Sequence, residues 1–206
     1  MPDRSDVELM LALKAGDEEA FQVLVQRHMA AVLNLAYRYL GNRADADDLA
    51  QEIFLKVHRA RARWRPEAKF TTWLYRVAAN ACLNEVRNRK QRPTHGAATL
   101  AEGGGEAWAA ATVSARADVE PHVAAERAEL HAQVRAAVDA LPERQRLALL
   151  LNKFHGLGYD ELASALELSV PAVKSLLVRA REGVRALIEP HLEGERGRVA
   201  GKRGLR

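Results

Sequence analysis

Apolar residues along this chain recur at intervals of three and four, which is the spacing of one face of an α-helix. Such stretches extend from about residue 6 to residue 90 and from about residue 120 to residue 189, with interruptions at "GNRADA" and "WRPEAK". No stretch shows the strict alternation of apolar and polar residues that marks a half-buried strand. The pattern therefore predicts an all-α protein with two helical blocks.

The segment between the two blocks has a different composition. Residues 93–118 contain Pro, a run of Gly and many Ala without a sustained apolar period, which is typical of a flexible linker. We therefore expect two small helical domains, residues 1–92 and 119–193, joined by that linker. The second block should end at Pro190, and residues 194–206, basic and interspersed with Gly, should form a disordered tail.

The second block contains a candidate helix-turn-helix at residues 160–182, "DELASALELSVPAVKSLLVRARE". A short helix should stop near Glu167, and Ser169 suits the N-cap of the next helix, where Pro171 is tolerated in the first turn. One stripe of the second helix is apolar and predicted to be core, and it consists of Val173, Leu177, Ala180, Val184 and Ile188. The candidate contacts to DNA lie mostly off that stripe, and they are Pro171, Ala172, Lys174, Ser175 and Arg179. A packed helical hairpin with a solvated basic face remains an alternative for this stretch alone.

Charge is segregated along the chain. The whole chain carries a net charge of +4, but residues 53–92 hold 11 Lys and Arg against 2 Asp and Glu, a net of +9. Residues 140–206 have a net charge of +4, whereas residues 1–52 and 93–139 have net charges of −5 and −4. Two separated basic blocks favour contact with nucleic acid at two places.

Two faces in the first block could carry binding. In the helix expected over residues 45–64, Leu49, Ile53 and Val57 should point to a core, and the opposite face presents Asp48, Gln51 and Glu52. That face could bind a protein or could be an ordinary solvated face.

The helix expected over residues 69–90 has a narrow stripe of alternating cations and amides, formed by Arg76, Asn80, Asn84 and Arg87. Amides can pair with base edges and cations with phosphates. Four aromatic residues nearby could stack on bases or belong to the core, and they are Trp64, Phe70, Trp73 and Tyr75.

Together these motifs resemble a known family. The stretches "DADDLAQEIF" and "FTTWLYRVAANACLNEVRNR", then a linker, then "LPERQRLALLLNKFHGLGYDELASALELSVPAVKSLLVRAR", look like the second and fourth regions of bacterial sigma factors of the extracytoplasmic-function group. The resemblance covers nearly the whole chain outside the linker and the tail. Two motifs in the order of the family, at about its separation, are more specific than either one alone.

The resemblance implies a function and its partners. The face of Asp48, Gln51 and Glu52 would bind the clamp helices of core RNA polymerase. The helix of Asn80 and the loop before it would read the −10 element of promoter DNA and hold a base flipped out of the opened duplex. The helix that starts at Ser169 would enter the major groove at the −35 element. The linker would run toward the RNA exit path, and an anti-sigma protein would be a further partner.

The sequence departs from the usual pattern of the family at two positions. Leu176 stands where the family usually has Arg, and Asn84 stands where Asp is common. A contact to DNA at Leu176 is therefore in doubt. The stripe of cations and amides also lacks the acidic residue that the family commonly has at the position of Asn84.

Three other classes of function fit the residues less well. A stand-alone helix-turn-helix regulator would leave the amide-rich first block unexplained, and a helical adaptor without nucleic acid would leave the two basic blocks unexplained. An enzyme is the least favoured class, because we find no Gly-rich phosphate loop, no metal-ligand spacing and no nucleophile beside a base, so no cofactor is expected.

The single Cys82 is expected to be a buried core residue. No apolar run is long enough to cross a bilayer and the first residues are unlike a signal peptide, so we expect a cytoplasmic protein that does not insert into the membrane.

Overall fold

The computed structural model describes residues 4–91 and 121–203, and the described residues are helical apart from turns and short loops. The helices are α1 (Asp6–Lys14), α2 (Glu18–Leu40), α3 (Arg43–Ala60), α4 (Phe70–Gln91), α6 (Pro121–Asp139), α7 (Glu143–Phe154), α8 (Tyr159–Leu166) and α9 (Val170–Arg203). The fold is all-α, as predicted. The predicted linker, residues 93–118, lies outside the described residues.

Local capping sets the helix boundaries of the first domain. Ser5 and Glu8 form a reciprocal capping box at the start of α1, and the side chains of Asp17 and Asn42 accept backbone N–H groups at the starts of α2 and α3. Gly41 ends α2 in the left-handed region at φ 77°, where a residue without Cβ is favoured. The residues predicted to face the core from α3 are buried together with side chains from α1, α2 and α4.

The second domain contains the predicted helix-turn-helix in α8 and α9. Glu167 ends α8 with φ 54°, and the Ser169 hydroxyl accepts a hydrogen bond from the backbone N–H of Ala172 at 3.3 Å, as expected of an N-cap. Val173 and Leu177 are fully buried against the rest of the domain. The predicted division of α9 into a core stripe and an exposed basic face is therefore confirmed for the first turns of the helix.

The C-terminal end of α9 differs from the prediction. The helix continues through Pro190 to Arg203, whereas the sequence predicts an end at Pro190 and disorder over residues 194–206. Proline removes one backbone hydrogen bond and usually bends a helix, but the helix can resume on its other side. Residues 204–206 lie outside the described residues.

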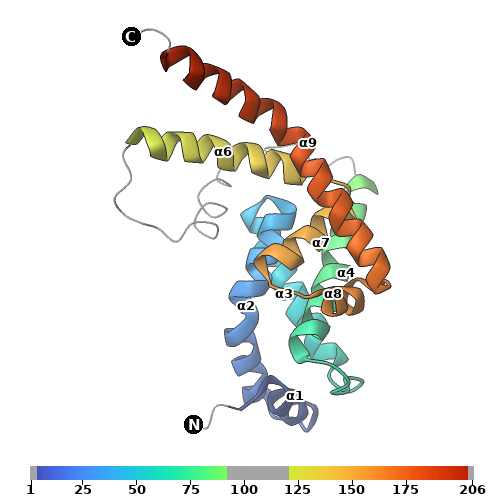
Figure 1. Ribbon diagram of the computed structural model, residues 1–206. Coiled ribbons are helices and arrows are strands. Elements are labelled where there is room, and N and C mark those ends of the chain that lie inside the picture. The colour runs from blue at the N-terminus through green and yellow to red at the C-terminus, as the bar shows by residue number, and fades with distance from the viewer. Residues whose placement is uncertain (1–3, 92–120, 204–206) are drawn as a thin grey trace.

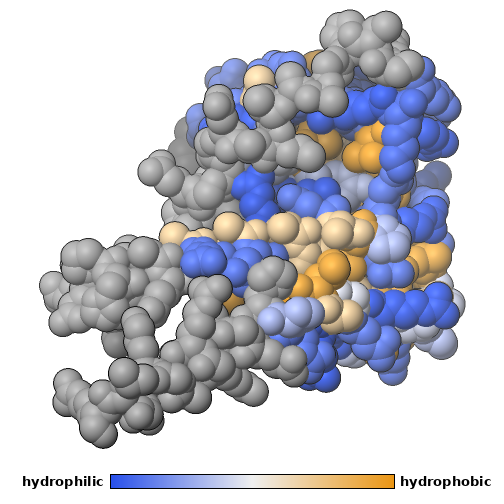
Figure 2. Space-filling model, turned by 90° about the horizontal axis from the view of Figure 1, so that it is seen from above, coloured by the Kyte–Doolittle hydropathy of each residue, from blue (hydrophilic) through white to orange (hydrophobic). Residues whose placement is uncertain are grey.

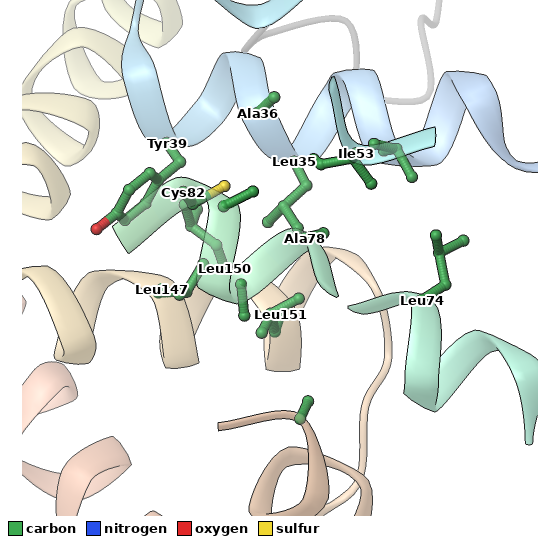
Figure 3. Packing of buried hydrophobic residues seen from close by; sticks show 14 of the residues in the cluster. Leu35, Ala36, Tyr39, Ile53, Leu74, Ala78, Cys82, Leu147, Leu150 and Leu151 are labelled. Atoms are coloured by element: carbon green, nitrogen blue, oxygen red, sulfur yellow. The ribbon is translucent and has the colours of Figure 1, made fainter. Parts of the chain in front are cut away.

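The two domains pack against each other and share one hydrophobic cluster. Figure 3 shows Leu147 and Leu150 of α7 pointing toward Ala78 and Cys82 of α4, with Tyr39 of α2 close to them. Cys82 is buried as predicted, and this burial raises the pKa of its thiol to about 12. The sequence predicts that these side chains are buried, but it does not reveal that they are buried across the two domains.

The arrangement of the helices leaves α6 and the C-terminal part of α9 projecting beyond the shared body (Figure 1). Figure 2 views the molecule from that end and shows a band of apolar residues between largely hydrophilic surfaces. In the described ranges, none of the helices combines the length and the apolar character needed to span a membrane. Within the same ranges, His, Cys, Asp and Glu do not gather in a group of three that could hold a metal ion.

Candidate functional site

The acidic face of α3 is open to solvent. Asp48, Gln51 and Glu52 are all exposed, while Leu49 and Ile53 on the opposite side are buried. The Glu52 carboxylate lies 2.7 Å from the Lys56 ammonium one turn later, which is an exposed pair of the kind that contributes little to stability. One large apolar side chain also lies on this side of α3, since Leu55 is 53% exposed. The face can therefore change residues without disturbing the core.

The stripe of cations and amides on α4 lies at the surface in part. Asn80, Asn84 and Arg87 are exposed and Arg76 is half-buried. The Arg87 guanidinium donates a hydrogen bond to the amide oxygen of Asn84. Where the family commonly has an acid, this chain therefore offers a neutral amide already engaged by its neighbouring cation.

The aromatic residues near α4 are mostly part of the core. Trp64 and Phe70 are buried, and Trp73 packs between them with ring centroids at 6.4 Å and 5.9 Å. Tyr75 instead reaches the second domain, where its hydroxyl lies 2.9 Å from Nδ1 of His155. Of the two interpretations that the sequence allows for the aromatic residues, core packing holds for Trp64 and Phe70.

The exposed face of α9 carries the residues predicted to read the −35 element. Pro171, Lys174, Ser175 and Arg179 are exposed, and Ala172 is half-buried in the first turn. The Lys174 ammonium lies 5.6 Å from the centre of the Tyr159 ring at the start of α8. Tyr159 was not among the residues selected from the sequence, although it directly precedes the stretch 160–182, and it is 41% exposed.

Leu176 is half-buried and packs against the hydrophobic cluster. An apolar residue at this position contributes to packing, whereas an arginine would extend its charged end to solvent. The packing therefore accounts for the leucine. The doubt raised by the sequence about a DNA contact at this position therefore has a structural basis.

The second domain lies beside part of the α4 stripe. Asn80 and Leu83 line a small cavity of about 100 Å³ together with Arg144 of α7 and the residues at the end of α8, which are Leu166, Glu167 and Leu168. The predicted −10 reader is therefore in contact with the domain predicted to read the −35 element. This contact between the two readers cannot be predicted from the helical pattern of either domain.

Two ion pairs join the basic surface of the first domain to the second. Lys69, directly before α4, lies 3.1 Å from the Glu161 carboxylate of α8, and Lys90 near the end of α4 lies 2.6 Å from the Glu143 carboxylate of α7. Hydrogen bonds from the Gly158 backbone and from Lys69 lower the pKa of Glu161, so its negative charge is favoured. Carboxylates of the second domain thus occupy cations that a phosphate could bind.

The comparisons with known proteins match both halves of this arrangement. Residues 24–92 match the family "Sigma-70 region 2", and residues 131–182 match "Sigma-70, region 4". The chain is a sigma factor of the extracytoplasmic-function group. It binds RNA polymerase and directs the initiation of transcription, and the alternative of a stand-alone helix-turn-helix regulator is not favoured.

Relatives of this sigma factor are similar over nearly their full length. It is 34% identical over 193 residues to the RNA polymerase sigma-H factor of Pseudomonas aeruginosa, covering 93% of this chain and 98% of that protein. It is 32% identical over 188 residues to the ECF RNA polymerase sigma-E factor of Escherichia coli K12, covering 90% of this chain and 95% of that protein.

Solved structures share the fold of this sigma factor. The structure of CnrH in complex with the cytosolic domain of CnrY matches with a TM-score of 0.61 and 24% identity, covering 88% of this chain and 96% of that one. The sigma factor RpoE in complex with the anti-sigma factor NepR from Bartonella quintana matches with a TM-score of 0.60 and 18% identity, covering 82% and 96%.

Proposed function

We propose that three surfaces of this sigma factor divide the work of promoter-directed initiation. The face of Asp48, Gln51 and Glu52 on α3 binds the clamp helices of core RNA polymerase. The α4 stripe reads the −10 element, and the start of α9 reads the −35 element. The corresponding units are a region 2 domain at residues 1–92, the linker at 93–118, a region 4 domain at 119–193 and a basic tail at 194–206.

The observation that carries the proposal is that α3 has its buried apolar residues on one side and its exposed acidic residues on the other. Its buried residues pack inside the first domain, and its acidic residues are exposed while the second domain packs on the neighbouring helix α4. A surface that stays exposed while the two domains are together suits the first contact with polymerase. Its negative charge favours a partner with a basic surface.

The α4 stripe suits the reading of single-stranded bases. Asn80 and Asn84 offer amide groups that can pair with a base edge, and Arg76 and Arg87 offer cations for phosphates. Because Trp64 and Phe70 are buried, any stacking on a flipped base falls to the partly exposed aromatic rings. In this respect the α4 stripe differs from a site in which all the neighbouring aromatic rings are exposed to a base.

The start of α9 suits the major groove. Lys174, Ser175 and Arg179 project from a helix whose other side is held in the core by Val173 and Leu177. The cations can hold phosphates or a guanine, while Pro171, Ala172 and Ser175 are near enough to the helix start to meet base edges.

Promoter binding requires the two domains to separate. The −10 and −35 elements are about 25 base pairs apart by their names, or roughly 85 Å of B-form DNA at about 3.4 Å a base pair. In this structure α8 packs directly on α4, so both elements cannot be reached at once. The arrangement in this structure is therefore the closed form of the free chain, and polymerase holds an open form.

Further partners and location follow from the family. An anti-sigma factor is a partner of the closed or partly closed form, by analogy with RpoE, whose structure was solved in complex with the anti-sigma factor NepR. The proposal places the chain in the cytoplasm, where RNA polymerase acts, and it assigns the chain no enzymatic activity and no cofactor.

Transcription in vitro tests the proposal. A genomic promoter library is transcribed by core polymerase with and without the full chain, and start sites are mapped. Promoters that fire only with the chain and share a −10 and a −35 element are the expected result. Binding of the chain alone to a specific operator, without any dependence on polymerase, would instead favour a stand-alone regulator.

A further inference from the structure

One hydrogen bond between the domains involves a titratable ring. The Tyr75 hydroxyl of α4 lies 2.9 Å from Nδ1 of His155, which follows α7, and the two ring centroids are 5.0 Å apart. Burial raises the pKa of Tyr75, so its hydroxyl keeps its proton near neutral pH. The bond therefore joins two neutral groups in the closed form.

The other nitrogen of His155 is enclosed without a partner. Its Nε2 is buried and makes no hydrogen bond. In the part of the chain that the structure describes, His155 forms no ion pair, and its hydrogen bond to Tyr75 is the only one it makes. A protonated imidazole is a donor at both nitrogens, so protonation would add a buried positive charge while the N–H group at Nε2 has no acceptor.

A cation from the first domain adds to this cost. The Arg38 guanidinium of α2 lies 3.9 Å from the centre of the Phe154 ring, next in sequence to His155. Burial first, and the positive charge of Arg38 second, lower the pKa of His155 from 6.5 to about 4. Both Tyr75 and Arg38 belong to the first domain, so their effects on His155 exist only while the domains are together.

We propose that His155 forms a proton-sensitive latch with Tyr75 and Arg38, in which the neutral ring holds the two domains closed and its protonation separates them and uncovers α4. The latch is a property of the free chain, and it does not depend on the surfaces assigned above to polymerase and promoter. Its physical basis is that solvent or a carboxylate can satisfy a charged imidazole in the open form. In the closed form the ring meets a hydroxyl and a cation.

The direction of the pH dependence follows from the two pKa values of His155. In the open form the ring takes a proton below its ordinary value of 6.5, whereas in the closed form it takes one only near 4. The full preference for the closed form is therefore present above pH 6.5, and it is lost progressively as the pH falls toward 4. Between about pH 7.5 and about pH 5.0, the ratio of closed to open chains should fall on the order of 30-fold.

One of the carboxylates that join the domains responds below this range. Glu161 of α8 accepts hydrogen bonds from the Gly158 backbone and from Lys69, which lower its pKa below 4.5. It therefore keeps its charge at pH 5.0, and its contribution to closure is lost only at lower pH. Lys90 and Glu143 form the second ion pair between the domains, and a variant of His155 separates the contribution of the ring from that of both pairs.

The first test measures the size of the full chain by small-angle X-ray scattering at about pH 7.5 and about pH 5.0, with circular dichroism to verify that the helices remain. The native chain should expand at the lower pH. The variant His155→Gln, which does not titrate, should give one radius of gyration at both pH values. The control His58→Gln removes a histidine that pairs with Glu18 inside the first domain, and it should expand like the native chain.

A second test does not depend on how well a variant folds. The titration of His155 is followed by NMR in the native chain. The native midpoint should lie well below 6.5, because burial and the positive charge of Arg38 favour the neutral ring. A native midpoint near 6.5, equal scattering curves at the two pH values, or the same expansion in His155→Gln would each overturn the latch.

Discussion

The ammonium of Lys90 lies 2.6 Å from the carboxylate of Glu143, and this pair links the last turn of α4 to the first turn of α7. Together with Lys69 and Glu161, it places two carboxylates of the second domain on the basic surface of the first. All four side chains are at least partly exposed to solvent, so each pair contributes at most about 1 kcal/mol to closure. The pairs therefore add a small contribution to closure beside the shared core and the Tyr75–His155 hydrogen bond.

Removing those two carboxylates should favour the open form. In the double variant Glu143→Gln and Glu161→Gln, the affinity of the free chain for DNA should rise by roughly a few-fold at low salt, because Lys69 and Lys90 become available to phosphates. The matched control Glu182→Gln with Glu189→Gln makes the same change in net charge on α9. Equal affinities in the two double variants, measured by fluorescence anisotropy, would show that net charge alone is responsible.

Reversal of charge on α3 should weaken the binding of polymerase. The change Asp48→Arg with Glu52→Arg places cations on a face that we expect to meet a basic partner, and like charges at an interface are costly. Helix content and melting temperature should stay near those of the native chain, because both residues are exposed. Titration of labelled chain with core polymerase measures the effect, and Glu19→Arg on α2 is the control. An unchanged affinity would remove the assignment of this face.

The change Asn80→Ala should relax base preference at one position of the −10 element. Loss of a hydrogen-bonded base contact costs about 1–3 kcal/mol of discrimination. Promoters with each base at each −10 position are transcribed by polymerase with the native chain, with Asn80→Ala, and with Asn34→Ala, which alters an exposed asparagine of α2. If the three proteins rank the promoters alike, Asn80 does not read a base.

The two cations at the start of α9 should hold the −35 element. In Lys174→Ala with Arg179→Ala, affinity for −35 DNA should fall and the remaining binding should depend less on salt, because fewer counterions are released from the DNA. Circular dichroism should show an intact fold, since both side chains are exposed. The control is Lys153→Ala, an exposed cation of α7. Transcription at the native level over a range of salt concentrations would identify the stretch as a packed hairpin.

Helical periodicity predicts the all-α fold and the position of the helix-turn-helix. It does so because Val173 and Leu177, or Leu49 and Ile53, recur at the spacing of one helix face, and capping residues such as Ser169 have a local preference. The break between α1 and α2 is less evident, since one glycine, Gly16 at φ 101°, makes the turn. Local signals of this kind are contained in short stretches of sequence.

The contacts between the domains could not be predicted in the same way. A buried Leu150 is compatible with burial inside its own domain, and neither Tyr75 nor His155 carries a signal for its partner 80 positions away. The sites are affected as well, because the cover over Asn80 depends on the placement of α8 on α4. Long-range placement depends on the shapes of two whole surfaces, and periodicity describes one element at a time.

The cluster shared by α4 and α7 also bears on the solubility of the chain. Leu147 and Leu150 are fully buried in the closed form, as is Cys82. Separation of the domains would bring apolar side chains of both surfaces to water, and contiguous exposed apolar surface promotes association between molecules. An opened chain without polymerase or another partner is therefore prone to aggregate. The closed packing protects each newly made molecule from its neighbours until a partner covers the surfaces that opening exposes.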